Sequence, residues 1–242
     1  MYKSLLLSNS SMPKAPYLQW CKEILNDFLK SRKNIIFIPY AAVRFSFDQY
    51  EDMVLKALSM DKKRFKSIHG FAEKIKAIKD CDSVVIGGGN TFVLKKRLED
   101  ENIFSKLKSK ISEPDFLYSG WSAGANLGGI SIKTTNDMPI VQPLDFQGLG
   151  TANFQINPHY TDLLFENHGG ETRDERLTEF SILNPGDFCV AIPEGSGVFV
   201  EKNKKNSMYF GKKPGKIFFN GKIHKQIKDQ ENFITTNHKN TN

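Results

Sequence analysis

A serine between two glycines stands where a predicted strand meets a predicted helix. The apolar residues 116–118 precede Gly120–Gly124 (GWSAG), and small helix-compatible residues follow. The pattern G-x-S-x-G after a strand predicts a nucleophile elbow, a sharp turn that lifts the hydroxyl of Ser122 clear of the sheet. Glycine is needed at both flanks because the turn is strained and its backbone approaches neighbouring elements closely. An ordinary glycine-rich turn has the same five letters, so the possible partners of Ser122 decide between the two interpretations.

A serine nucleophile needs a base within hydrogen-bond reach, and the chain has five histidines. His159 is the best-placed base, because Pro158 restrains the backbone that leads to it. His168, beside Gly169 and Gly170, is the alternative. His69 lies near a predicted strand end and is interpreted as a structural residue. His224 and His238 lie in the basic C-terminal segment.

The base in turn needs an orienting carboxylate, and two residues compete for this role. Asp137 lies in the polar stretch TTNDMP between apolar runs. Glu194 follows a predicted strand directly and is held between Pro193 and Gly195. Either residue could instead be an ordinary turn former.

A second glycine-rich loop, Gly87–Gly89 followed by Asn90, ends another predicted strand. Its spacing matches neither G-x-G-x-x-G nor G-x-x-x-x-G-K-[ST], so a nucleotide cradle is disfavoured. The alternative is an oxyanion hole, in which N–H groups near Gly88 and Gly89 act together with the N–H of Ala123. No histidine or cysteine pair has metal-ligand spacing, so neither a metal nor a cofactor is expected.

Alternating strands and helices between residue 3 and about residue 126 position these loops. Apolar runs predict strands at 3–8, 34–39, 82–86 and 115–119 and a short one at 67–69, with helices at 16–30, 48–60, 71–78, 91–97 and 104–111. This order predicts an α/β fold with a mostly parallel sheet and helices on both faces. Ligands bind at the carboxyl ends of such strands, where both glycine-rich loops fall.

The second half of the chain changes character. Residues 131–162 are rich in turn formers, and a polar loop leads into a helix that ends at residue 183. A buried-type strand at 188–192 is followed by short antiparallel strands at 198–200, 207–210, 216–219 and 223–227. We expect one α/β domain over residues 1–230 and a frayed basic and polar tail over 231–242.

Composition limits the possible classes of protein. The length of 242 residues is sufficient for a self-contained core, and no apolar run approaches the ~20 residues of a membrane span. The net charge of +7 arises from residue 201 onward, where ten lysines face three acids, so the body is formally neutral. We therefore expect neither nucleic acid nor a membrane as partner, although an anionic partner for the tail stays open. Three widely spaced cysteines favour a reducing, cytoplasmic compartment.

The motifs together resemble peptidase E, the α-aspartyl dipeptidase family of serine peptidases. The matching stretches run in the family's order over residues 4–197: LLLSNS, IIFIPYA, VVIGGGNTF, GWSAGAN, TTNDMPIV, QINPHY, GETRDER and IPEG. The resemblance implies a class I glutamine-amidotransferase-like fold and hydrolysis of dipeptides that begin with aspartate. It implies Ser122 as nucleophile, His159 as base, and either Asp137 or Glu194 as the third member. We favour Glu194, because its position at a strand end is better defined.

The resemblance also directs attention to how the substrate is bound. An N-terminal aspartate needs a cation for its side chain, and Arg173 in the GETR stretch can clamp a carboxylate bidentately. Asn90 is the second candidate for substrate binding. The expected partner is a small Asp-Xaa peptide, and the protein is expected to be a monomer or homodimer. The alternatives are a cyanophycinase-like β-aspartyl peptidase and a non-catalytic binding protein on the same fold.

Overall fold

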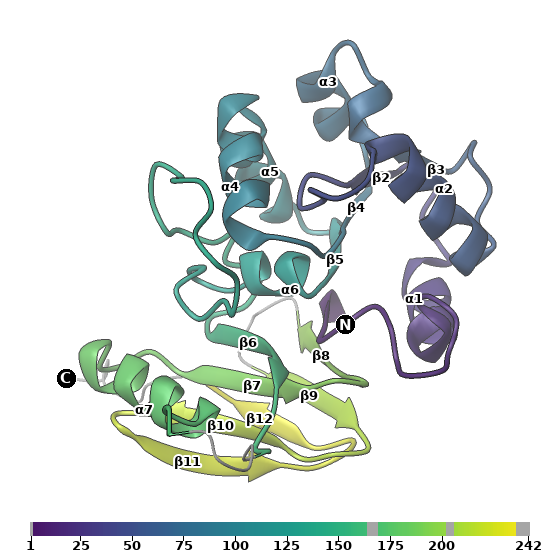
Figure 1. Ribbon diagram of the computed structural model, residues 1–242. Coiled ribbons are helices and arrows are strands. Elements are labelled where there is room, and N and C mark those ends of the chain that lie inside the picture. The colour runs from purple at the N-terminus through teal and green to yellow at the C-terminus, as the bar shows by residue number, and fades with distance from the viewer. Residues whose placement is uncertain (1, 164–168, 202–205, 236–242) are drawn as a thin grey trace.

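The computed structural model describes residues 2–163, 169–201 and 206–235, which form two sheets (Figure 1). The larger sheet has the strand order β12-β9-β8-β1-β5-β4-β2-β3. Five neighbouring strands are parallel: β1 (Tyr2–Leu7), β5 (Leu117–Trp121), β4 (Ser83–Ile86), β2 (Ile35–Ile38) and β3 (Phe65–Ser67). On the other side of β1, the antiparallel strands are β8 (Ser196–Glu201), β9 (Asn206–Gly211) and β12 (Asn232–Ile234). The predicted α/β fold class is confirmed.

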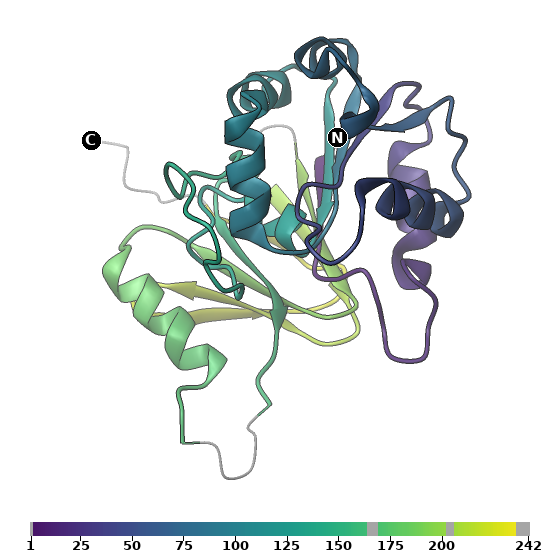
Figure 2. The same ribbon diagram turned by 45° about the horizontal axis from the view of Figure 1, so that its top comes forward.

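Helices cover both faces of the larger sheet (Figure 2). One face packs against α1 (Lys22–Leu29) and α2 (Phe47–Leu58). The other face packs against α3 (Lys74–Asp80), α4 (Thr91–Asp100), α5 (Ile103–Ile111) and α6 (Ala123–Gly128). Every residue of β2 and β4 is buried. This explains why these strands are continuous apolar runs rather than alternating ones, since a strand covered on both faces has no solvent side.

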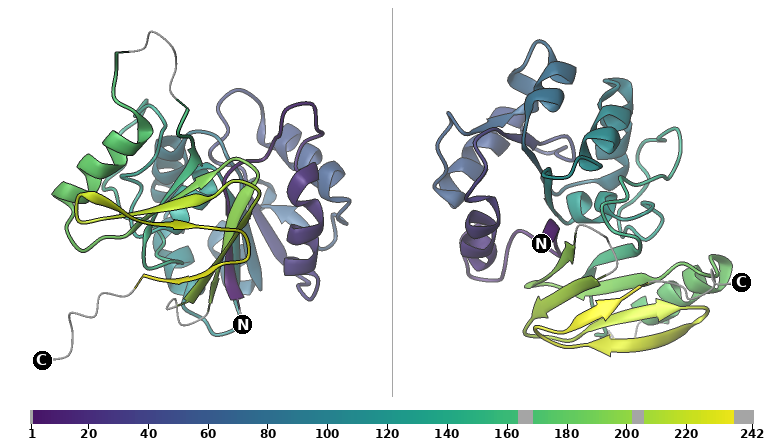
Figure 3. Two further views of the ribbon diagram at one scale, coloured as in Figure 1. Left: turned by 90° about the horizontal axis from the view of Figure 1, so that it is seen from below. Right: turned by 180° about the vertical axis from the view of Figure 1, so that it is seen from behind.

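The smaller sheet has the order β11-β10-β7-β6, and its strands run across those of the larger sheet (Figure 3). Its strands are β6 (Gln155–Tyr160), β7 (Cys189–Pro193), β10 (Gly215–Phe219) and β11 (Lys222–Ile227), with β6 parallel to β7. Helix α7 (Arg173–Leu183) covers one face, where Leu177 packs with Cys189 and Phe218. Ile156, Ile192 and Ile217 belong to the core that α6 and the larger sheet share. The two sheets are therefore joined through a common hydrophobic core.

The structure corrects several expected boundaries. Residues 155–160 form β6, a strand that the sequence did not predict because the region is rich in turn formers and contains Pro158. The proline lies where the pairing with β7 shifts register, between Asn157 and Tyr160. The helix expected from residue 16 begins at Lys22, after a short 3₁₀ turn, because Leu18 is buried with its N–H bonded to Ser10 O.

Two further boundaries shift near the ends of elements. The short strand expected at 67–69 is β3 at Phe65–Ser67, and it is followed directly by a 3₁₀ turn. The expected tail begins too early, because β12 pairs with β9; residues 236–242 lie outside the described residues. In the part of the chain that is described, no helix has the length and apolarity to cross a bilayer.

Candidate active site

Ser122 occupies a strained backbone position at the end of β5. Its φ of 53° and ψ of −114° are unusual for a residue with a side chain, and its N–H donates to Leu7 O at 3.0 Å. A Cβ on Gly120 would lie 2.6 Å from the backbone of Gly124, and one on Gly124 would lie 2.2 Å from Ile86 O. Both flanking positions therefore require glycine, and the reason given by the sequence pattern is confirmed.

His159 reaches Ser122 from the smaller sheet. Its Nε2 lies 2.9 Å from Ser122 Oγ, although the two residues come from different sheets. The backbone at His159 has a φ of 55° at the bulge in β6, and its N–H donates to Ser8 Oγ at 2.8 Å. Ser8 in turn donates to Ile192 O at 2.9 Å. The buried Ser8 therefore connects the end of β1 to the two strands that border the site.

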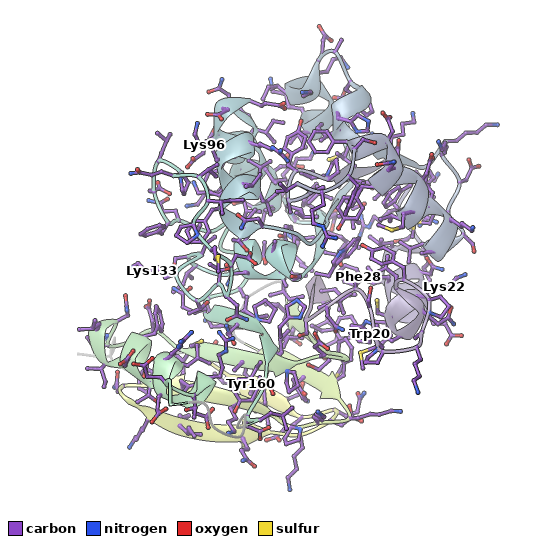
Figure 4. All side chains as sticks on the ribbon, in the orientation of Figure 1. Trp20, Lys22, Phe28, Lys96, Lys133 and Tyr160 are labelled. Atoms are coloured by element: carbon purple, nitrogen blue, oxygen red, sulfur yellow. The ribbon has the colours of Figure 1, made fainter. Side chains whose placement is uncertain are left out.

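Glu194 contacts the other nitrogen of the imidazole. Its Oε1 lies 2.8 Å from His159 Nδ1, directly after the end of β7. The next residue, Gly195, has a φ of 77° and donates its N–H to Asn9 Oδ1 at 2.8 Å. Trp20, labelled in Figure 4, donates to Asn9 O at 3.2 Å and so holds this loop from the side of α1. These contacts define the position of the carboxylate, which is itself 49% exposed.

Asp137 has a different environment. Its Oδ2 accepts from the N–H of Thr91 at 2.7 Å and from the Thr91 hydroxyl at 2.6 Å. The Thr135 hydroxyl donates to the same oxygen at 3.1 Å. Asp137 therefore sits at the start of α4. There its carboxylate accepts from a free N–H group of the first turn, and the positive end of the helix dipole stabilises its negative charge. Of the two competing carboxylates, the structure brings Glu194 to the imidazole and Asp137 to α4.

Arg173 connects to the site through Asn136, a residue that the sequence analysis did not single out. The guanidinium donates to Asn136 Oδ1, which also accepts from Asn157 Nδ2 at 2.7 Å. The Nδ2 of Asn136 donates to Pro158 O at 2.8 Å, one residue before His159. The only sequence signal for Asn136 was its place beside Asp137 in the TTNDMP stretch. Burial lowers the pKa of Arg173, with a smaller contribution from Arg176, yet a guanidinium stays charged at neutral pH.

The glycine loop after β4 lies against the elbow. A Cβ on Gly88 would come within 3.0 Å of Ser122 Cβ, so the two backbones are in close contact. Gly89 has a φ of 142°, and a Cβ there would lie 2.1 Å from Ala41 O. Asn90 caps α4 by accepting from Val93 N at 3.0 Å, and its Nδ2 donates to Met138 O at 2.9 Å. Asn90 thus joins this loop to the segment that carries Asn136 and Asp137.

The other expected histidines have other surroundings. His69 contacts Ser67 Oγ at 2.6 Å and Asp48 Oδ1 at 3.0 Å. Asp48, Glu51 and His69 form the one group in the described ranges whose three potential metal-ligand atoms lie within 4.8 Å of one another. The group lies on α2 and on the turn after β3. His224 packs against the rings of Phe188 and Phe219. His168 and His238 lie outside the described residues.

Comparisons with known proteins identify the family of the chain. Residues 4–208 match the model of peptidase family S51. The chain belongs to this family. A protein named peptidase E from Nostoc sp. is 42% identical over 198 residues, which cover 81% of each chain. A peptidase E from Haemophilus influenzae is 42% identical over 205 residues, covering 83% of this chain and 86% of the relative.

Solved structures support the fold of this S51 peptidase. A peptidase from an acI-B1 Actinobacterium superposes with a TM-score of 0.67 at 17% identity, covering 97% of both chains. A putative peptidase E from Listeria monocytogenes superposes with a TM-score of 0.55 at 19% identity, covering 90% of this chain and 98% of the other. At such identities the likeness concerns the fold alone.

Proposed function

We propose that this S51 peptidase hydrolyses dipeptides with an N-terminal aspartate through an acyl-enzyme at Ser122. The observation that carries the proposal is the continuous hydrogen-bonded chain from Glu194 through His159 to Ser122, with distances of 2.8 and 2.9 Å. Nucleophile, base and orienting acid in this order are the parts that acyl transfer by a serine requires. The buried, free cysteines support a cytosolic location for the enzyme.

In the first half of the reaction, His159 Nε2 takes the proton of Ser122 as Oγ attacks the peptide carbonyl carbon. The carboxylate of Glu194 holds the imidazole by Nδ1 and stabilises the imidazolium that forms. His159 then gives the proton to the leaving amine as the C–N bond breaks. In the second half, water attacks the ester, His159 takes its proton, and Ser122 is released.

The developing oxyanion needs N–H donors near Ser122. Ala123 N–H follows the nucleophile directly, and the Gly88–Gly89 backbone supplies the remaining donors. The close contact of Gly88 with Ser122 supports this role, because a Cβ at residue 88 would lie 3.0 Å from Ser122 Cβ. Removing one oxyanion donor typically lowers the rate by about 10²–10³.

Specificity for aspartate comes from Arg173. Its guanidinium is half-buried and reaches the segment that borders His159 through Asn136. In the complex, the substrate carboxylate accepts from this guanidinium, and Asn90, whose Nδ2 has a second hydrogen besides the one donated to Met138 O, contributes a neutral contact. A partly desolvated cation attracts a carboxylate more strongly than it attracts the matching amide. Asn-Xaa dipeptides should therefore be poor substrates.

The direct test compares kcat/KM for Asp-Leu, Asn-Leu and β-linked Asp-Leu. We expect cleavage of α-linked Asp-Leu alone, and loss of activity in Ser122→Ala with an unchanged melting temperature. Preferred cleavage of the β-linked peptide would instead indicate a cyanophycinase-like specificity. A wild-type protein that cleaves none of them and resists serine-reactive phosphonates would be a binding protein, and the proposal would be abandoned.

The role of Arg173 has a matched control in the same helix. Arg176 is exposed and pairs only loosely with Glu171 at 3.8 Å. Arg173→Ala should lower kcat/KM for Asp-Leu by about 10²-fold or more, since a charge-assisted bidentate contact contributes roughly 3 kcal/mol. Arg176→Ala should keep wild-type kinetics. Equal activity in the two variants would remove Arg173 from the substrate site.

A further inference from the structure

A buried hydroxyl lies beneath the glycine loop that borders Ser122. Tyr50, on α2, is 2% exposed, and its hydroxyl donates to Gly88 O at 3.0 Å. The hydroxyl oxygen of Tyr50 itself accepts from Trp121 Nε1 at 3.2 Å and from the Tyr17 hydroxyl at 3.4 Å. A phenol has one hydrogen to donate and two acceptor sites. Two incoming donors therefore leave the hydrogen of Tyr50 for Gly88.

The bond to Gly88 O determines where the next N–H points. The Gly88–Gly89 peptide is trans, so the carbonyl of Gly88 and the N–H of Gly89 point in opposite directions within one plane. Because Tyr50 draws the carbonyl into the aromatic cluster, the N–H of Gly89 is turned away from that cluster. Among the described residues, the N–H groups of Gly88 and Gly89 have no hydrogen-bond acceptor, whereas those of Gly87 and Asn90 donate to Ile38 O and Ala41 O.

The loop cannot hold this orientation by itself. Three consecutive glycines have more accessible backbone conformations than any other tripeptide, so rotation of the central peptide plane is easy. Such a rotation would turn the carbonyl of Gly88 toward the site and remove a donor. Tyr50 is well suited to prevent it, because Phe37 and Phe45 pack edge-on against its ring with centroids 5.1 and 5.0 Å away. The fit is also tight, since a Cβ on Gly87 would lie 2.5 Å from the Tyr50 hydroxyl.

We propose that Tyr50 is a positioning residue for acyl transfer: its hydroxyl fixes the Gly88–Gly89 peptide so that the loop presents N–H groups to the oxyanion. This role rests on the proposed serine mechanism but not on the identity of the substrate. Trp121 shares the role by orienting the hydroxyl, and it precedes the nucleophile directly. The aromatic cluster between α2 and β5 thus connects the elbow and the oxyanion loop through a single oxygen atom.

The test uses the rate at which diisopropyl fluorophosphate labels Ser122. Here Ser122 Oγ bonds to phosphorus, fluoride leaves, and His159 takes the serine proton, while the phosphoryl oxygen needs the same N–H donors as a peptide oxyanion. Tyr50→Phe should slow labelling roughly 10- to 100-fold, less than the full loss of one donor, because the loop still samples the correct orientation. With a cleavable dipeptide, kcat should fall while KM stays within about twofold.

Tyr209 provides the matched control, since it is fully buried and its hydroxyl also donates to a backbone carbonyl, that of Lys213. Tyr209→Phe should lose similar stability and keep the wild-type labelling rate. Equal labelling rates in Tyr50→Phe and the wild type, or equal slowing in both variants, would overturn the proposal.

A second variant keeps the test decisive if Tyr50→Phe does not fold. Trp121→Phe keeps a ring in the stack with Phe37 but removes the N–H donated to Tyr50. It should slow labelling about five- to tenfold, as expected for losing the bond that orients the hydroxyl. An unchanged rate would count against the role of Tyr50. Normal labelling of the wild type without cleavage of any Asp-Xaa peptide would refute the proposed substrate and leave this inference standing.

Discussion

At the scale of single residues, the site depends on side chains held in costly backbone conformations. Ser122 and His159 both have positive φ values, of 53° and 55°, and neither is glycine. Such positions persist only where the surrounding structure over-determines them. Ser122 is held between Leu7 and the helix that it begins, and His159 is held by Ser8. The same contacts that hold these two strained backbones therefore also hold the side chains at their 2.9 Å separation.

Replacing a carboxylate by its amide should have different consequences at Glu194 and at Asp137. Glu194→Gln keeps a hydrogen-bonding group at His159 Nδ1 but removes the charge that stabilises imidazolium, so kcat/KM should fall roughly 10²–10⁴-fold. Asp137→Asn can still accept from Thr91 N and should change kcat/KM much less, with a stability loss of about 1 kcal/mol. Steady-state kinetics and urea unfolding on both variants check this. A larger catalytic loss in Asp137→Asn would transfer the orienting role to that residue.

At the scale of elements, the first turn of α7 determines where Arg173 points. Thr172 and Glu175 form a capping box that defines the start of the helix. Asp174 accepts from the Tyr160 hydroxyl on β6 at 2.6 Å and from Lys216 Nζ on β10 at 2.7 Å. Figure 4 labels Tyr160 on the smaller sheet, beside α7. The residues on either side of Arg173, Thr172 and Asp174, are therefore both held by hydrogen bonds, and this fixes the backbone from which Arg173 projects.

Asp174→Asn should loosen this anchor, because Lys216 would lose its ionic partner. We expect KM for Asp-Leu to rise roughly three- to tenfold with little change in kcat, since misplacement weakens substrate binding first. The free energy of unfolding should fall by about 1–3 kcal/mol. Glu171→Gln, in the exposed segment just before α7, is the control and should behave as the wild type. A purely kcat effect in Asp174→Asn would contradict this account.

Helix α4 is fastened to the segment that carries Asp137 by a buried charge. Lys95 is 1% exposed and pairs with Glu99, which is 5% exposed, and with Asp145 at 3.0 Å. Its ammonium also lies 3.6 Å above the ring of Phe104, and Glu99 accepts from Leu144 N at 2.9 Å. The Lys95–Glu99 pair and Asp137 thus hold the two ends of residues 137–145 against α4.

Lys95→Ala should destabilise the protein by about 3–5 kcal/mol, because it leaves the carboxylate of Glu99 buried without a counter-charge. The adjacent Lys96 is the matched control: it points to solvent (Figure 4) and pairs with Asp100 at the surface. Lys96→Ala should cost at most about 1 kcal/mol. Urea unfolding of the two variants measures the difference, and similar midpoints would show that Glu99 finds other compensation.

At the scale of the whole molecule, the three cysteines lie in the cores that join helices to sheets. Cys21 and Cys81 are 0% and 2% exposed, and burial raises the pKa of each thiol from 9.0 to about 12. Burial also raises the pKa of Cys189. Thiolate is the reactive form, so the native protein should react very slowly with dithionitrobenzoate at pH 8, and all three thiols should react in urea. Rapid native labelling would refute this packing.

The same raised pKa values have a consequence for stability. The folded state keeps the thiol protons at pH values where the unfolded chain releases them. The thiols therefore contribute their full stability below the unfolded value of 9.0, and this contribution is lost as pH rises toward about 12. The melting temperature of the wild type should fall across this range. Replacing Cys81 by alanine should make the fall shallower.

Local patterns in the sequence predicted most of the elements and the sharp turn at Ser122. Apolar runs without alternation identified β2 and β4, because strands covered on both faces bury every side chain. The glycines at 120 and 124 identified the elbow, because close backbone contacts there exclude any Cβ. These features depend on neighbours along the chain, so they are visible in a short stretch of sequence. The expected α/β fold followed from the order of the elements.

Only the tertiary structure decided which distant groups meet. The sequence favoured Glu194 but left Asp137 as the alternative; the pairing of β6 with β7 brings Glu194 to His159, whereas Asp137 lies at α4. The strand β6 was hidden by Pro158, because its stability comes from pairing with β7 and not from local propensity. Asn136 and Tyr50 were not recognised for the same reason. Their roles arise from contacts across 22 and 38 residues of sequence, which no local pattern encodes.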